Sequence, residues 1–289
     1  MRPPRPINDG ISGEMVSRLR YRRAVSVSRR SIGCAVLTLG AVAFLGLGCS
    51  SDDGPEPVVT DLNHVTTITS EKEAEALYGE LRSLGLPVAW KFAEYGPISS
   101  GGISLGNLNV ELGSGITPEA GDQFATFEPP ALKGLTEDLD ERGIKHGKPI
   151  PTKAGSRLLY TRVVLPTYSQ AKRMTTQFCA YAFPSGKPTT MAPANRAGVV
   201  NVSRVILNTR DPDSWEKLFA PSEASPGNVY SFSSGPLVQL EKSANASVAS
   251  IEVKVKDVTR ATREFRNVGI SVEDGVATLG SLQLRFTDA

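Results

Sequence analysis

The chain has 289 residues, of which 40 % are apolar and 21 % charged, so it is long enough for one large domain or two small ones. This composition excludes a disordered or fibrous chain. The net charge of +2 is unevenly distributed, because residues 1–48 hold eight arginines and two acidic residues and the rest holds 24 basic and 28 acidic groups. The basic excess therefore belongs to the segment before Cys49, and we expect no nucleic acid partner.

The segment before Cys49 has the pattern of an export signal. Arginines precede an uncharged stretch, Ser31–Gly48, which is interrupted by glycines and ends at Cys49. The small residues before Cys49 and the sequence SSDDGPEP after it are similar to a bacterial lipoprotein cleavage site and its tether. We therefore predict lipidation of Cys49 and a membrane-anchored protein of the cell envelope. Cleavage without lipidation, an uncleaved anchor and a true start at Met15 stay open.

From residue 60 onward, short β-rich runs alternate with single amphipathic helices. In the first unit a strand over 62–69 precedes a helix over about 71–84, which Ser70 caps at its start and Gly85 ends. Three short strand-like runs separated by glycine turns follow. The order of elements is β-α-β-β-β.

The same order recurs three more times along the chain. The second unit, over 122–184, includes a predicted helix over 131–142, and a single gapless shift aligns the first two helices and places Gly85 on Gly143. A compressed third unit begins at 199 and a fourth near 248. The helix-to-glycine phrases LRSLGL, LDERGI and FRNVGI are the clearest repeat signature. The sequence therefore predicts an α+β fold of four βαβββ modules.

These modules are expected to pair into two domains behind the leader. Residues 1–48 are the predicted signal peptide and 49–59 the tether. The first domain, over 60–186, is expected to carry the functional site. A linker over 187–198, rich in Pro, Thr and Ala, leads to a second, degenerate domain over 199–289.

Histidine and cysteine are scarce, and this limits the chemistry. The whole chain has two histidines, His64 and His146, so a zinc site with three histidines is impossible within one chain. After removal of the leader and lipidation of Cys49, Cys179 is the one remaining thiol, so no intramolecular disulfide can form. Cys179 lies in the apolar run TQFCAYAF and is predicted to be a small core residue.

The four-fold βαβββ repeat, with LNHV opening the first unit and GNLNVELGS closing it, resembles the vicinal oxygen chelate superfamily. That superfamily includes glyoxalases, extradiol dioxygenases and fosfomycin or bleomycin resistance proteins. The resemblance covers residues 60–289 and implies modules that pair into curved, partly closed mixed sheets around a cavity. It also implies metal ligands on the first and last strands of paired modules. Carried over, His64 and Glu111 fall on two ligand positions, and Glu111 is the candidate catalytic residue.

The second unit is expected to supply the third ligand. The gapless shift that aligns the helices places Asp122 opposite His64, with Gln123 beside it, while the closing strand offers Gln177, Cys179 or Tyr181 in place of a glutamate. Such a set suits a divalent Fe, Mn, Ni or Zn ion. The alternatives are a hydrogen-bonded sheet histidine at position 64 and a solvated strand residue at position 111.

The C-terminal pair of modules lacks these ligands. Arg204 takes the place that His64 has in the first unit, and arginine does not ligate cations, so this half is predicted to be a structural partner. If Arg204 faces a cavity, it would hold a carboxylate or phosphate of the substrate. Tyr181 and other aromatic residues would line an apolar pocket, although core packing is the default for most of them.

Two functional hypotheses remain. The first is a cell-envelope, metal-dependent enzyme of the glyoxalase or dioxygenase type that acts on a small oxygenated substrate. The second is a small-molecule-binding lipoprotein that has kept the cavity and lost the metal. The sequence names no substrate and leaves the oligomeric state open.

Overall fold

The structure is a computed structural model that describes residues 56–95, 98–115, 121–154, 156–182 and 194–289. All described residues belong to one compact unit. The predicted signal peptide, Cys49, most of the tether and most of the predicted linker therefore lie outside the described residues. Within the described part, no helix is both long enough and apolar enough to cross a membrane.

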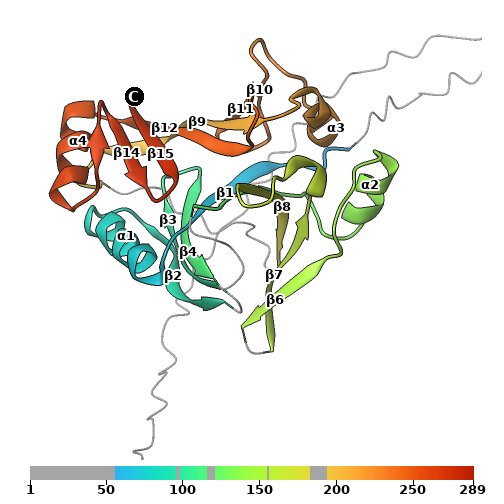
Figure 1. Ribbon diagram of the computed structural model, residues 1–289, viewed down its shortest axis with the longest axis horizontal. Coiled ribbons are helices and arrows are strands. Elements are labelled where there is room, and N and C mark those ends of the chain that lie inside the picture. The colour runs from blue at the N-terminus through green and yellow to red at the C-terminus, as the bar shows by residue number, and fades with distance from the viewer. Residues whose placement is uncertain (1–55, 96–97, 116–120, 155, 183–193) are drawn as a thin grey trace, which may run out of the picture. The chain divides into compact units, whose positions relative to one another are not determined.

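The first two units form one eight-stranded mixed sheet, with the strand order β2-β3-β4-β1-β5-β8-β7-β6. At its centre β1 and β5 lie side by side and antiparallel, while β4 runs parallel to β1 and β8 parallel to β5 (Figure 1). The strands are β1 (Asp61–Ile68), β2 (Val88–Tyr95), β3 (Ile98–Ser104), β4 (Asn109–Gly115), β5 (Gln123–Glu128), β6 (Ile150–Ala154), β7 (Arg157–Val164) and β8 (Met174–Tyr181). The helices are α1 (Glu71–Ser83), α2 (Leu135–Glu141) and the 3-10 helix η1 (Pro166–Tyr168).

The last two units form a seven-stranded mixed sheet, with the order β10-β11-β9-β12-β15-β14-β13. It repeats the central arrangement, since β9 and β12 are antiparallel and each has a parallel neighbour, β11 or β15. The elements are β9 (Val199–Thr209), η2 (Asp213–Trp215), α3 (Glu216–Phe219), β10 (Val229–Tyr230), β11 (Leu237–Lys242), β12 (Ser247–Val255), α4 (Val258–Asn267), β13 (Val272–Glu273), β14 (Val276–Leu279) and β15 (Leu282–Asp288). Two curved mixed sheets with few helices confirm the predicted fold class, although the third unit has one strand fewer than the others.

Local sequence signals account for the helix boundaries. Helix α1 begins where predicted, because the Ser70 hydroxyl accepts a hydrogen bond from the Glu73 amide at 3.3 Å. It packs on β3 and β4 (Figure 1) and ends before Gly85, whose φ of +79° suits glycine. The second helix starts at Leu135, four residues later than predicted, because Gly134 has a φ of +86° and stands at its N-cap.

The two sheets share one hydrophobic core. The Phe127 ring on β5 packs against Phe219 and Phe232 of the C-terminal half, with ring centroids 5.5 and 6.3 Å away. A polar side chain of β5 also contacts the C-terminal half: the Gln123 amide nitrogen donates to the Ser281 carbonyl, and its oxygen accepts from the Val248 amide. The other face of the first sheet is therefore the one left to form a site.

Candidate functional site

A small cavity of about 160 Å³ lies on the face of the first sheet that the core does not use. Every residue of β1 is buried. Alternate residues of this strand, His64, Thr66 and Ile68, line the cavity because successive strand side chains point to opposite faces. Side chains of β2, β3, β4, β5, β7 and β8 complete its wall. The volume is below the range of roughly 300–1,000 Å³ that is typical of ligand pockets, so the cavity suits a small ligand.

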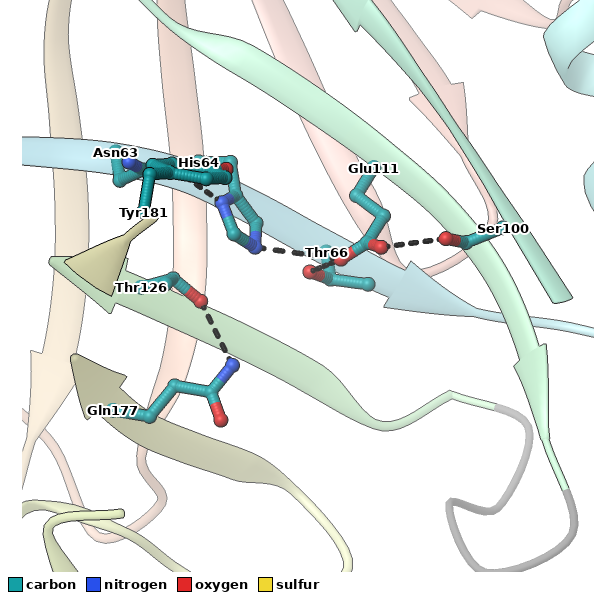
Figure 2. A network of polar contacts seen from close by, with 8 residues as sticks. All are labelled: Asn63, His64, Thr66, Ser100, Glu111, Thr126, Gln177 and Tyr181. Carbon is teal, nitrogen blue, oxygen red and sulfur yellow. Dashed lines mark hydrogen bonds and ion pairs between the residues drawn. The ribbon is translucent and has the colours of Figure 1, made fainter. Parts of the chain in front are cut away.

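His64 and Glu111 meet in this cavity. Their side chains are 8 % and 14 % exposed, and His64 Nε2 lies 3.4 Å from Glu111 Oε2. Two hydroxyls hold the carboxylate in place: Thr66 donates to Oε2 and Ser100 to Oε1, each at 2.7 Å (Figure 2). Burial raises the pKa of Glu111, but the bonds and charge of His64 and these two hydroxyls outweigh it, so the net pKa lies below its ordinary value. Glu111 is therefore ionised at neutral pH.

Asn63 fixes the tautomer of His64. The Asn63 amide nitrogen donates to Glu128 Oε2 at 3.1 Å, so its Oδ1 must act as the acceptor. Oδ1 lies 2.5 Å from His64 Nδ1 and also accepts the Tyr181 hydroxyl at 3.2 Å (Figure 2). Nδ1 therefore carries the hydrogen, and in the neutral ring the lone pair of Nε2 faces the Glu111 carboxylate. Two acceptors in this position require a proton or a metal cation between them.

The strand registers relate the two halves of the site by an internal two-fold symmetry. Val65 on β1 pairs with Ala125 on β5, and a two-fold axis between these residues exchanges the two strands. His64 comes one residue before Val65, and Phe124 comes one residue before Ala125. Phe124 is therefore the symmetry counterpart of His64. Glu111 pairs with Thr66, and in the same way Gln177 pairs with Thr126. Gln177 is therefore the counterpart of Glu111.

Neither a protein-family model nor a curated protein matches the chain. Solved structures with a similar fold include a hypothetical protein from Staphylococcus aureus (8 % identity, 80 % of this chain and 100 % of that one, TM-score 0.55). A triple mutant of 4-hydroxymandelate synthase from Streptomyces coelicolor is similar over 79 % of this chain and 92 % of its own, with 11 % identity and a TM-score of 0.51. The Mn(II)-bound glyoxalase from Novosphingobium aromaticivorans is similar over 81 % and 83 %, with 10 % identity and a TM-score of 0.53.

The chain has the vicinal oxygen chelate fold. At this identity the likeness concerns the fold alone, so the chemistry must come from the residues in the cavity. Within this fold the structure brings the predicted residues His64, Glu111 and Tyr181 to one cavity.

The structure does not bring the other two predicted ligands, Asp122 and Gln123, to this pair. The Ile68 amide donates to the Asp122 carbonyl at 2.9 Å, so Asp122 lies four residues along the sheet from His64, about 13 Å at roughly 3.3 Å per residue. Gln123 points to the opposite face and bonds to the second sheet. The register of the two central strands pairs Val65 with Ala125, and this shift along the sequence differs from the one that aligns the helices.

Gln177 is a further side chain of the cavity wall with an oxygen that could act as a donor. Its amide nitrogen donates to Thr126 Oγ1 at 3.2 Å (Figure 2), and its Oε1 is buried without a hydrogen-bond partner in the described residues. The described part of the chain contains no cluster of three His, Cys, Asp or Glu side chains suited to a metal. A third protein ligand beside His64 and Glu111 would therefore have to be another group, such as an amide oxygen. Two ligands about 2.1 Å from one ion at a tetrahedral angle are roughly 3.4 Å apart, which matches the His64 to Glu111 separation. His64 and Glu111 therefore have the separation of two ligands of one divalent ion, and Gln177 lines the same cavity.

Three further polar side chains of β7 and β8 line the cavity: Tyr160, Arg162 and Cys179. Burial and the charge of Glu111 raise the pKa of Tyr160 to about 12, and burial raises the pKa of the Cys179 thiol. Both groups stay protonated at neutral pH. The predictions omitted Arg162, although the alternation in LLYTRVV puts it on the same strand face as Tyr160.

The predicted substrate residue Arg204 lies on β9, in the second sheet, and is not part of the cavity wall. Its Nη1 donates to Gln239 Oε1 at 2.6 Å, and its Nε lies 3.5 Å from Glu252 Oε2. The chain's own side chains therefore occupy this guanidinium. His146 is also remote from the cavity and pairs with Asp140 at 3.3 Å in the segment after α2.

Proposed function

We propose that this protein is a divalent-metal-dependent enzyme of the glyoxalase or dioxygenase type, acting on a small oxygenated substrate in the cavity of the first sheet. The observation that carries the proposal is the His64 to Glu111 pair. Asn63 Oδ1 accepts the Nδ1 hydrogen, so Nε2 of a neutral His64 would present its lone pair to the Glu111 carboxylate 3.4 Å away. Neutral imidazole and carboxylate are suitable ligands for Mn²⁺, Fe²⁺, Ni²⁺ and Zn²⁺.

Each residue has a distinct role in this proposal. His64, Glu111 and the Gln177 amide oxygen would hold the ion, and Thr66 and Ser100 would orient the carboxylate. A bound divalent ion supplies Lewis-acid polarisation of substrate oxygens. Glu111 is ionised and lines the cavity, so it is also the group that would accept a proton from the substrate.

A second candidate function is a binding protein without metal, and Phe124 favours it. This residue is the counterpart of His64 across the internal symmetry and lines the cavity with a ring that cannot ligate a cation. In that case a protonated His64 would form an ion pair with Glu111, and the cavity would bind its ligand without a metal.

Thermal unfolding with and without Mn²⁺ separates the two functions. A metal that binds only the folded state should stabilise it by about 2.7 kcal/mol at a hundred times its dissociation constant. His64→Ala and Glu111→Gln should each remove most of this gain, and Gln177→Ala should reduce it. Gln239→Ala, a half-buried glutamine on β11 of the second sheet, is the matched control and should keep the full gain. A wild-type protein that gains nothing from Mn²⁺, Fe²⁺, Ni²⁺ or Zn²⁺ would favour the binding protein.

We also propose that the protein is an exported lipoprotein, anchored to the membrane through Cys49. The support is the sequence pattern of the leader: arginines, an uncharged stretch and small residues before the cysteine. Cys49→Ser should abolish acylation and stall or release the chain, as metabolic labelling with a radioactive fatty acid and fractionation would measure. An unprocessed mutant retained in the membrane as well as the wild type would indicate an uncleaved anchor instead.

A further inference from the structure

Arg162 is a charged residue in the cavity wall that forms no ion pair within the described residues. It lies on β7, directly opposite Cys179 on β8. Its Nε is buried and has no hydrogen-bond acceptor in the described residues, and Arg162 is absent from the ion pairs that the described arginines form. A buried guanidinium nitrogen without an acceptor costs free energy, so such a group persists where another molecule provides the acceptor.

The side chains next to Arg162 on the strand face are not carboxylates. Its neighbours there are the thiol of Cys179, directly opposite on β8, and the phenol of Tyr160, two residues earlier on β7. Glu111 is ionised but is held by Thr66, Ser100 and His64. The positive charge at this end of the cavity is therefore available for a ligand.

Aromatic rings form much of the remaining wall. Tyr160 and Tyr181 are in edge contact, with centroids 6.1 Å apart, and Trp90 makes an edge contact with His64 at 5.7 Å. Rings arranged in this way favour a flat, apolar ligand body. The volume of about 160 Å³ restricts that body to a small one.

We propose that the cavity binds a small, flat carboxylate whose anionic group bonds to the Arg162 guanidinium. Arginine suits this role because its planar fork of donors matches a carboxylate. The inference rests on the proposed function in that it uses the same cavity. The anionic group of the ligand would lie at the positively charged Arg162, and not at the His64 and Glu111 pair. It needs no metal, and so it can be tested separately.

Benzoate and benzamide are suitable probes, because they have nearly the same shape and differ in charge. Their binding to the full-length chain in detergent, freed of metal with EDTA, would be measured by calorimetry at pH 7. Benzoate should bind at least about tenfold more tightly than benzamide. Arg162→Gln should abolish this preference and Arg162→Lys should reduce it. The matched control is Arg157→Gln, an exposed arginine on the same strand, which should keep the preference.

Equal binding of the two probes, no binding of benzoate, or an unchanged preference in Arg162→Gln would overturn the inference. If Arg162→Gln does not fold, Arg162→Lys decides, and a preference equal to that of the wild type would count against the inference. Because the protein is metal-free throughout, absence of a metal site leaves the benzoate result valid. A failed benzoate preference likewise leaves the metal proposal standing.

Discussion

Replacing Asn63 by alanine should weaken metal binding without removing any metal ligand. Asn63 is fully buried and makes three side-chain hydrogen bonds, to His64 Nδ1, the Tyr181 hydroxyl and Glu128. Residues that orient a metal-bound histidine typically contribute roughly 10–100-fold in metal affinity, about 1.4–2.7 kcal/mol. The loss of three hydrogen bonds should also cost the metal-free protein about 3 kcal/mol of stability, at roughly 1 kcal/mol each.

Two measurements follow this variant: calorimetric titration with Mn²⁺ and urea unfolding of the metal-free protein. Asn208→Ala is the matched control, since Asn208 is a half-buried strand asparagine of the second sheet with one side-chain bond, to Ser247 at 3.1 Å. It should lose about 1 kcal/mol of stability and no metal affinity. An Asn63→Ala protein with wild-type Mn²⁺ affinity would show that the tautomer of His64 is irrelevant to metal binding, and would refute the reasoning.

Three further predictions test the core, the thiol and the internal symmetry. Phe127→Ala should lower the free energy of unfolding by about 3–5 kcal/mol and Tm by about 6–20 °C, and the chain should still unfold in one cooperative transition. Two separate transitions in calorimetry would mean that the sheets do not share a core. Cys179, 2 % exposed and with a raised pKa, should resist iodoacetamide at pH 8 until urea unfolds the chain, with Cys179→Ser correcting for other thiols; rapid native alkylation would contradict its burial. Phe124→His should tighten Mn²⁺ binding at least about tenfold, or roughly 1.4 kcal/mol, by adding a fourth ligand; an unchanged affinity would argue against the symmetry.

The fold was predictable because each module carries its own local signals. Ser70 and Gly85 mark the ends of α1, and the repeated helix-to-glycine phrases indicate repeated units. The third unit is short, as the compressed third copy in the sequence predicts: α3 has four residues and two strands follow it. Periodicity predicts which elements exist more reliably than how many residues connect them.

The candidate site was predictable only where strand position decided it. His64 and Glu111 were identified from the resemblance, which implies ligands on the first and last strands of paired modules, and they lie in one cavity. Asp122 and Gln123 were expected beside them from the alignment of the helices, whereas the register of β1 and β5 follows a different shift. The strand register thus makes Phe124, and not Asp122, the counterpart of His64.

Gln177 and Arg162 illustrate what a single sequence cannot provide. Gln177 was one of three open choices on the closing strand, and the pairing of β5 with β8 makes it the counterpart of Glu111. Arg162 was omitted because its significance is the absence of an acceptor for a buried nitrogen among the described residues, which is a property of packing. Alternation along a strand predicts a face, and only the assembled sheets define what that face contacts.

Metal stoichiometry after reconstitution tests the central claim most directly. The full-length protein, purified without a histidine tag, would be dialysed against Mn²⁺, Fe²⁺, Ni²⁺ or Zn²⁺ in turn and analysed for bound metal by elemental mass spectrometry. The proposed site predicts about one ion per chain for at least one metal, and almost none in the His64→Ala, Glu111→Gln double variant. No stoichiometric metal in the wild type, or full retention in the double variant, would contradict it.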